Sequence, residues 1–339
     1  MKIVCFGEIM LRLSPPNYER FVQANKFNVV YGGGEANVSV SLANYNLPVS
    51  FVTKLPDNLI GQAALNDLRK FGVDTSFIPR GGKRLGIYYL EKGFSQRPSK
   101  VVYDRAYSSV SESRVEDFDF DKIFEGATWF HFTGISPALG NNVAEVVKKA
   151  CKTAKKLGVK ISCDLNYRKN LWSREEAQNC MTELMEYVDV VIANEEDADM
   201  VFGIKADKSD IEKGVLEHSA YEDVAKKLKD KFNFEKVAIT LRTSISACDN
   251  NWAALLYNGD EFYLSKEYKM HIVDRVGGGD SFGAGLIYGI LNGFSDKDTI
   301  EYAAAASCLK HSIEGDYNQV SVDEVKALMA GDSTGRVKR

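Results

Sequence analysis

The feature that most constrains the fold of this chain is a regular alternation of strand-like and helix-like segments from about residue 128 onward. Short apolar runs occupy 128–134, 159–166, 187–194 and 236–241. Between the first two runs, apolar residues recur at helical spacing from Val143 to Leu157, and Gly158 follows as a helix stop. Buried strands separated by amphipathic helices predict an α/β fold in which helices cover both faces of a parallel sheet.

The first third of the chain predicts a smaller β-structure beside that sheet. Segment 1–9 is typical of a core strand, whereas 27–33, 85–91 and 99–106 are typical of antiparallel ribbons. Such a ribbon does not bury itself well, so we expect a lid formed by about 11–33 and 85–108. Helical spacing predicts one helix over 36–47 and another over 65–71. A hairpin with Asn258 and Gly259 at its turn is predicted for 252–265.

Length and composition are those of a single soluble domain, which we expect to span 1–328 and to end in a polar tail over 329–339. The 339 residues are 45% hydrophobic and carry a net charge of −4, which argues against a nucleic-acid partner. No apolar run is long enough for a membrane span, and the N-terminus lacks the pattern of a signal peptide. Six scattered cysteines without a CxxC pair predict reduced thiols in the cytoplasm. The four histidines show no metal-ligand spacing.

The stretch DRVGGGDSFGAG at 274–285 gives the strongest indication of chemistry. Gly277, Gly278 and Gly279 place bare backbone N–H groups at a tight turn, and a helix is predicted from Asp280. A helix N-terminus is a ready anion site, and glycine lets a ligand approach the backbone. An anion there would lie beside Asp280, an arrangement that suits phosphoryl transfer with the carboxylate as proton acceptor. The spacing alone fits equally well a simple helix cap at Asp280.

Two motifs together resemble the ribokinase-like (pfkB) carbohydrate kinase family. The segment 274–282 resembles its C-terminal signature D-T-x-G-A-G-D, and YGGGEANVSVSLA at 31–43 resembles its N-terminal signature. The similarity runs over about 1–328. It implies a three-layer α/β/α core with a parallel-rich sheet and a small β-ribbon lid. It also implies site roles: a catalytic base, Asp280; an anion hole of Gly277, Gly278 and Gly279; and sugar-binding residues Gly33, Gly34 and Asn37.

Within that family, three further segments resemble 2-keto-3-deoxygluconate kinases: 101–109, 130–139 and 164–172. A sugar acid carries a carboxylate, which an arginine fork binds in two places. The resemblance therefore implies that Arg105 on the lid and Arg168 at the carboxyl edge of the sheet bind the substrate. Tyr89 and Tyr103 are expected to line the same face of the ribbon. Without the resemblance, both arginines would be interpreted as surface ion-pair partners.

The resemblance also implies ATP as phosphoryl donor and Mg²⁺ as its metal, and it leaves a K⁺ requirement open. Asp197 resembles the acidic residue that holds the metal through water. Three positions depart from the family pattern, since Arg242 and Ile245 replace glycines and Ala304 replaces an asparagine near adenine. The residues expected to bind the nucleotide are Asn166, Arg168, Asn194, Arg242, Gly277, Gly279, Gly315 and Asp316.

The sequence thus predicts a cytoplasmic, ATP-dependent sugar-acid kinase, with 2-keto-3-deoxygluconate as the first choice of substrate. Its galactonate epimer remains open, because the orientation of one hydroxyl leaves no mark in the sequence. Two alternatives are a kinase for a neutral sugar such as fructose or ribose, and a non-catalytic sugar or nucleotide sensor. Exposed ribbon edges favour a homodimer or higher homo-oligomer formed through the lid.

Overall fold

A computed structural model describes residues 1–206 and 218–332. Within this part of the chain, the larger sheet has nine strands in the order β12-β11-β10-β9-β8-β7-β1-β4, and β13 pairs with β11. Every pair from β10 to β4 is parallel, whereas β11 lies antiparallel to β10. All four predicted strands are present. The strands are β1 (Lys2–Phe6), β4 (Val49–Val52), β7 (Ala127–Thr133), β8 (Lys160–Asp164), β9 (Val190–Ala193), β10 (Lys236–Ser244), β11 (Asp249–Tyr257), β12 (Phe262–Leu264) and β13 (Tyr268–His271).

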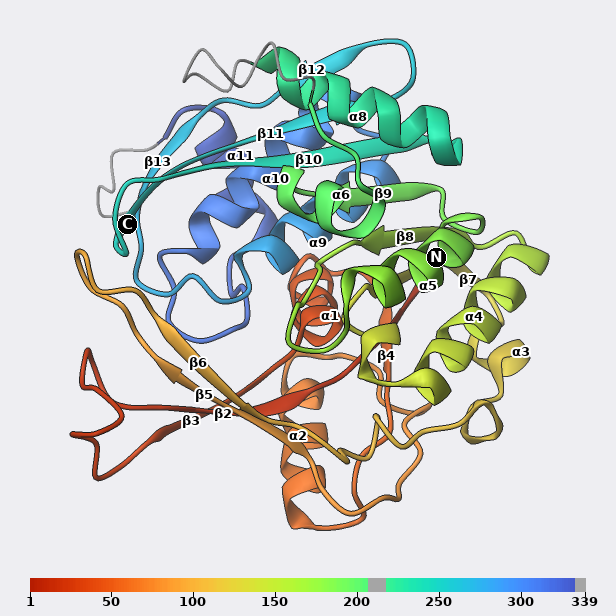
Figure 1. Cartoon of the computed structure of the whole chain (residues 1–339), viewed down its shortest axis with the longest axis vertical. Helices are drawn as coiled ribbons and strands as arrows, with labels where there is room; N and C mark the ends of the chain where they lie inside the picture. The colour runs from red at the N-terminus through yellow and green to blue at the C-terminus, as the bar shows by residue number, and fades with distance from the viewer. Residues whose placement is uncertain (207–217, 333–339) are drawn as a thin grey trace.

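Helices cover both faces of this sheet, as predicted (Figure 1). Successive residues of β1 enter different cores, since Val4 packs on one face and Ile3 and Cys5 pack on the other. One face carries α3 (Phe120–Ile123), α4 (Asn141–Lys156), α5 (Arg174–Met185), α6 (Glu195–Phe202) and α8 (His218–Phe232). The other carries α1 (Gly34–Asn44), α2 (Leu59–Lys70), α9 (Gly278–Leu291), α10 (Asp296–Lys310) and α11 (Val322–Met329).

The lid is a four-stranded sheet of its own, with the order β3-β2-β5-β6. Its red and orange strands project from the lower left of the body in Figure 1. The strands are β2 (Met10–Ser14), β3 (Asn28–Gly32), β5 (Gly86–Glu91) and β6 (Lys100–Asp104). The hairpin-like pairs are antiparallel, as predicted, but β2 and β5 run parallel and join the two halves of the lid.

Local signals placed many element ends correctly, with several corrections. The helix predicted over 65–71 begins earlier, at Leu59, and ends at Lys70, and the strands β2 and β4 were not predicted. Gly158 ends α4 with a left-handed φ of 73°, as expected for a helix stop. The helix predicted over 36–47 stops at Asn44, and the hairpin turn spans four residues, because Tyr257 pairs with Phe262. Helix α9 begins at Gly278 and not at Asp280, and α11 was not predicted.

The last helix reaches Met329, so the beginning of the expected tail is helical. The rest of that tail, from 333 onward, lies outside the described residues. All six cysteines are free thiols, as expected from their spacing. In the described part of the chain, every helix is too short or too polar to cross a bilayer.

Candidate active site

The N-terminus of α9 has the backbone geometry that the glycine run predicted. Gly277 is the N-cap and has a left-handed φ of 83°. A Cβ at Gly277 would lie 2.0 Å from the backbone oxygen of Asp316, so this position has no room for a side chain. A Cβ at Gly279, by contrast, would meet nothing within 4 Å. The mouth of the helix is therefore open and not plugged by protein atoms.

This mouth opens into a cavity of about 1490 Å³ between the lid and the carboxyl ends of β8, β9 and β10. The carboxyl edge of an open parallel sheet is where ligands bind. Of the predicted site residues, the following line the cavity: Gly33, Gly34, Asn37, Tyr103, Arg105, Asn166, Arg168, Asn194, Asp197, Arg242, Gly277, Gly278, Gly279, Asp280 and Asp316. Tyr89 and Gly315 are not among the lining residues.

Asp280 lies in the first turn of α9, and its carboxylate is held by Asn37 from α1. The Asn37 side-chain amide donates to Oδ2 of Asp280 at 2.7 Å, and its own oxygen accepts from the Gly33 N–H at 3.2 Å. Burial raises the pKa of Asp280 to about 6, and the Asn37 hydrogen bond opposes that rise. Asp280 is therefore largely ionised at neutral pH and suited to accept a proton.

Two further aspartates stand at the carboxyl edge of the sheet. Asp164 ends β8, and burial together with the charges of Asp197 and Asp280 raises its pKa well above the ordinary value. Burial also raises the pKa of Asp197 to about 6, although Oδ1 of Asp197 accepts the Tyr167 N–H at 3.0 Å. Asp164 was not predicted as a site residue, although its place at the end of a predicted strand was a usable signal.

The two predicted arginines differ in how far their charges are already paired. Arg105 is buried on Glu8, to which its Nη2 donates, while its Nε has no hydrogen-bond partner among the described residues. Arg168 is exposed and donates to the backbone oxygen of Tyr167 at 3.1 Å. No carboxylate lies within 4.0 Å of Arg168 in the described part of the chain. Of the two arginines, Arg168 thus has the uncommitted charge.

The expectation that Tyr89 shares a face with Tyr103 is wrong by one residue. Tyr103 pairs directly with Tyr88 across β5 and β6, and opposed residues point to the same face. The rings of Tyr88 and Tyr103 lie 6.1 Å apart, and both residues line the cavity. Tyr89 packs on the other face, with its ring 6.0 Å from that of Phe27. The correction follows from the alternation of side chains along a strand.

The residues at which nucleotide binding was expected or doubtful differ in their burial and in their hydrogen bonds. Asn194 caps α6 and accepts the Asp197 N–H at 2.7 Å, so its side-chain oxygen already has a structural bond. Arg242 is exposed at the end of β10, and Ile245 is 65% exposed beyond it. Ala304 is fully buried in α10 within the core between the helices and the sheet.

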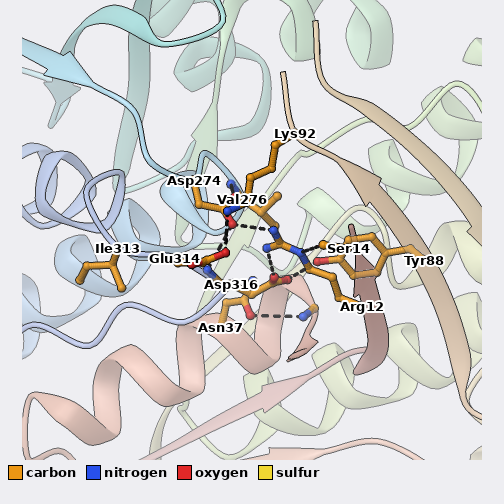
Figure 2. Close-up of polar contacts among 12 residues, drawn as sticks. Arg12, Ser14, Asn37, Tyr88, Lys92, Asp274, Val276, Ile313, Glu314 and Asp316 are labelled. Atoms are coloured by element: carbon orange, nitrogen blue, oxygen red, sulfur yellow. Dashed lines mark hydrogen bonds and ion pairs between the residues drawn. The ribbon is translucent and has the colours of Figure 1, made fainter. Parts of the chain in front are cut away.

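A buried polar network ties the lid to the loops around the α9 N-terminus, and sequence reasoning missed it. Figure 2 shows the Arg12 guanidinium of β2 directed at the carboxylates of Asp274 and Asp316. The two ion pairs measure 2.5 and 2.7 Å. The Tyr88 hydroxyl donates to the second oxygen of Asp316 at 2.5 Å. The Gly315 N–H donates to Asp274 at 3.1 Å, which fixes Gly315 just behind the cavity wall.

Comparison with known proteins agrees with this architecture. Residues 1–322 match the family described as pfkB family carbohydrate kinase. The chain is 31% identical to a 2-dehydro-3-deoxygalactonokinase of Haloferax volcanii, over 98% of each chain. It is 26% identical to a 2-dehydro-3-deoxygluconokinase of Bacillus subtilis, over 95% of this chain and 93% of the relative. A crystal structure of 2-dehydro-3-deoxygluconokinase from Thermotoga maritima superposes with a TM-score of 0.94 at 53% identity, covering 98% of this chain and all of the other.

Proposed function

This chain belongs to the pfkB family of carbohydrate kinases, and within that family we propose that it phosphorylates 2-keto-3-deoxygluconate at its terminal hydroxyl, with ATP as donor. The single observation that carries the proposal is the Asp280 carboxylate, held by Asn37 at the open mouth of a helix. The 53% identity to a 2-dehydro-3-deoxygluconokinase supports the choice of sugar acid.

In the proposed reaction, Asp280 accepts the proton of the attacking sugar hydroxyl as the oxygen approaches the γ-phosphorus. The backbone amides of Gly277 and Gly279 lie at the positive end of α9 and would stabilise the charge on the transferred phosphoryl group, whereas the Gly278 N–H already donates to the Arg275 backbone oxygen at 3.3 Å. Because Asp280 and these amides share one helical turn, base and anion hole keep a fixed relative position. Closure of the lid over the cavity would exclude water as a competing acceptor.

The acidic side of the cavity is suited to Mg²⁺ that is bound together with ATP. In the described residues no three acidic, histidine or cysteine side chains converge on one point, so a site made of protein ligands alone is absent. Mg²⁺ normally uses one or two carboxylates, several waters and the substrate phosphates. Asp164, which lines the cavity without a side-chain hydrogen bond in the described part, would hold such an ion together with Asp197. The ion would neutralise charge on the phosphate oxygens.

The uncommitted guanidinium of Arg168 is proposed to bind the substrate carboxylate. Arg105 is proposed to contribute through its unpartnered Nε while Glu8 holds the rest of its guanidinium. Tyr88 and Tyr103 form the lid wall of the same cavity. A neutral sugar has no group that requires Arg168, so this residue separates the acid-sugar proposal from its nearest alternative.

The test is an assay of ADP release on a panel of 2-keto-3-deoxygluconate, its galactonate epimer, fructose and ribose. We expect the first acid to give the highest kcat/KM. Asp280→Asn should cut turnover by about 10²–10⁴-fold while leaving nucleotide binding nearly intact. Arg168→Ala should abolish discrimination in favour of the acids.

Each alternative has its own signature in this assay. A neutral-sugar kinase would turn over fructose or ribose faster and would tolerate Arg168→Ala. A sensor would bind sugar or nucleotide without releasing ADP on any member of the panel. Near-normal turnover by Asp280→Asn would remove that residue from its proposed role.

The lid is proposed to mediate self-association. Its outer strands expose apolar side chains, among them Val29 at 60% and Val102 at 53%. Isolated apolar residues are common on surfaces, but a row on two lid strands is typical of an interface. Sedimentation of the wild type against Val29→Lys measures whether this surface holds a dimer together.

A further inference from the structure

A lysine is buried behind the anion hole, where a free charge is costly. Lys310 is the last residue of α10 and is 0% exposed. Its ammonium donates to the backbone oxygens of Asp274 at 3.3 Å and Ile313 at 3.2 Å. Its Cε lies 3.2 Å from the position that a Cβ of Gly277 would take. The ammonium therefore supports, from the inside, the turn whose outer side faces the cavity.

The neighbouring carboxylates do not pair directly with this ammonium. Within the described residues no acidic oxygen lies within 4.0 Å of the Lys310 nitrogen, and the carboxylates of Asp274 and Asp316 are bound to Arg12. These two carboxylates still favour the charged form of Lys310, against the burial that lowers its pKa. A compact cation coordinated by backbone carbonyls, with acidic groups one layer further out, is the environment in which proteins hold K⁺.

The two carbonyls belong to two separate loops that together shape the helix mouth. The Asp274 carbonyl opens the segment that leads to Gly277, and Ile313 precedes Gly315, whose N–H donates to the Asp274 carboxylate. The same carboxylate accepts the Val276 N–H at 3.2 Å. One cation thus fixes both loops against each other directly beneath the anion hole.

We propose that the ammonium of Lys310 is a built-in monovalent cation, which positions the Gly277 turn for phosphoryl transfer and makes added K⁺ unnecessary. Lys310 is a positioning residue, because it touches neither the cavity nor the reacting atoms. The proposal rests on the proposed kinase function. It answers the question of a K⁺ requirement, which the sequence leaves open, with a residue of this chain. A lysine nitrogen carries the same single charge as K⁺ but is delivered by a tether and cannot dissociate.

The test compares monovalent cations at constant ionic strength, because surface electrostatics change with salt. The wild type is assayed for phosphoryl transfer in chloride salts of K⁺, NH₄⁺, Na⁺, Li⁺ and tetramethylammonium. We expect the same kcat and the same KM for ATP in all five salts. In Lys310→Met, kcat should fall by about a hundredfold in tetramethylammonium, since the anion hole loses its support. K⁺ or NH₄⁺ should then raise the kcat of Lys310→Met by at least about tenfold. Li⁺ and tetramethylammonium should have no effect, because their sizes do not fit the site.

Lys297→Met is the matched control, because Lys297 is an exposed lysine on the same helix. It should behave like the wild type in every salt. A purely structural role for Lys310 would lower activity without any selective rescue, and that result overturns the proposal. If Lys310→Met does not fold, the wild-type series still decides, because a wild type that needs added K⁺ overturns the inference alone. A wild type that transfers no phosphate in any salt overturns the proposed function and this inference together.

Discussion

Removing the side-chain amide of Asn37 should make the proposed base harder to ionise. In the free protein Asn37 donates to Asp280 at 2.7 Å, and this bond opposes the burial that raises the Asp280 pKa to about 6. A hydrogen bond to a charged group contributes about 1.5–3 kcal/mol, and a shift of one pKa unit corresponds to about 1.4 kcal/mol. Because the Asp280 carboxylate is partly exposed at the cavity, we take the lower limit. Asn37→Ala should then raise the pKa of Asp280 by about one unit.

The rate effect follows from the ionised fraction of Asp280 in each protein. At pH 6 that fraction falls from about one half in the wild type to about one tenth in Asn37→Ala. The kcat/KM at pH 6, expressed as a fraction of the value at high pH, should therefore be about fivefold lower in the variant than in the wild type. At pH 7 the factor is about two, and above pH 8 it approaches one. The base works only when deprotonated, so activity is lost as pH falls, and the variant loses it at a higher pH than the wild type.

The measurement is kcat/KM for the sugar acid between pH 5 and pH 9, which reports the pKa values of the free enzyme. A lost contact between Asn37 and a sugar hydroxyl lowers the whole curve by a constant factor, whereas a changed pKa moves the acid limb. Asn44→Ala removes an asparagine from the same helix, where it donates to the Asn318 carbonyl, and should leave the limb in place. Coincident acid limbs in the wild type and Asn37→Ala would refute the reasoning that links this hydrogen bond to the base.

Two further predictions concern the helix mouth and its acidic wall. Gly279→Ala should fold normally, because its Cβ meets nothing within 4 Å, yet it should lower kcat/KM by at least about tenfold by occupying the anion hole. Gly277→Ala should instead lower the free energy of unfolding by about 1–3 kcal/mol, since its φ is 83° and its Cβ would strike Asp316; urea unfolding compares the two. Asp164→Asn should raise the melting temperature, and more at pH 8 than near pH 4. The folded pKa of Asp164 is raised, so the wild type loses stability as pH rises from the ordinary value of 3.8 through that folded pKa, and asparagine cannot ionise. An equal gain at both pH values would contradict this assignment.

The parts of the fold that depend on local pattern were predictable from the sequence. The strands of the parallel core appear as continuous apolar runs because both faces are covered, and all of them except β4 were identified. The parallel pairing of β2 with β5 was not, because it joins segments more than about 70 residues apart and no turn signal marks it. The antiparallel pair of β5 and β6, in contrast, is joined by a turn-rich link and was predicted, whereas β2 was not predicted as the partner of β3.

The residues of the site were also predictable where local sequence determines their geometry, and not where the folded chain decides it. Glycines report backbone geometry through their own identity, so the run at Gly277 marks the turn in the sequence itself. Tyr88 and Tyr89 are identical neighbours in the sequence, and only the strand register decides which of them faces the cavity. Asp164 lies within a segment that was interpreted as core, and its exposure to the cavity depends on where β8 ends.

Lys310 marks the limit of sequence reasoning most clearly. Lysine is almost never fully buried, so a lysine at the last position of a helix is expected at the surface. Its burial results from two loops, at 274 and 313, whose carbonyls converge only in the folded chain. The base and the anion hole are encoded in one short motif, but the cation that supports them comes from the following helix. A substitution at Lys310 would therefore leave both family motifs intact and still remove the support of the turn.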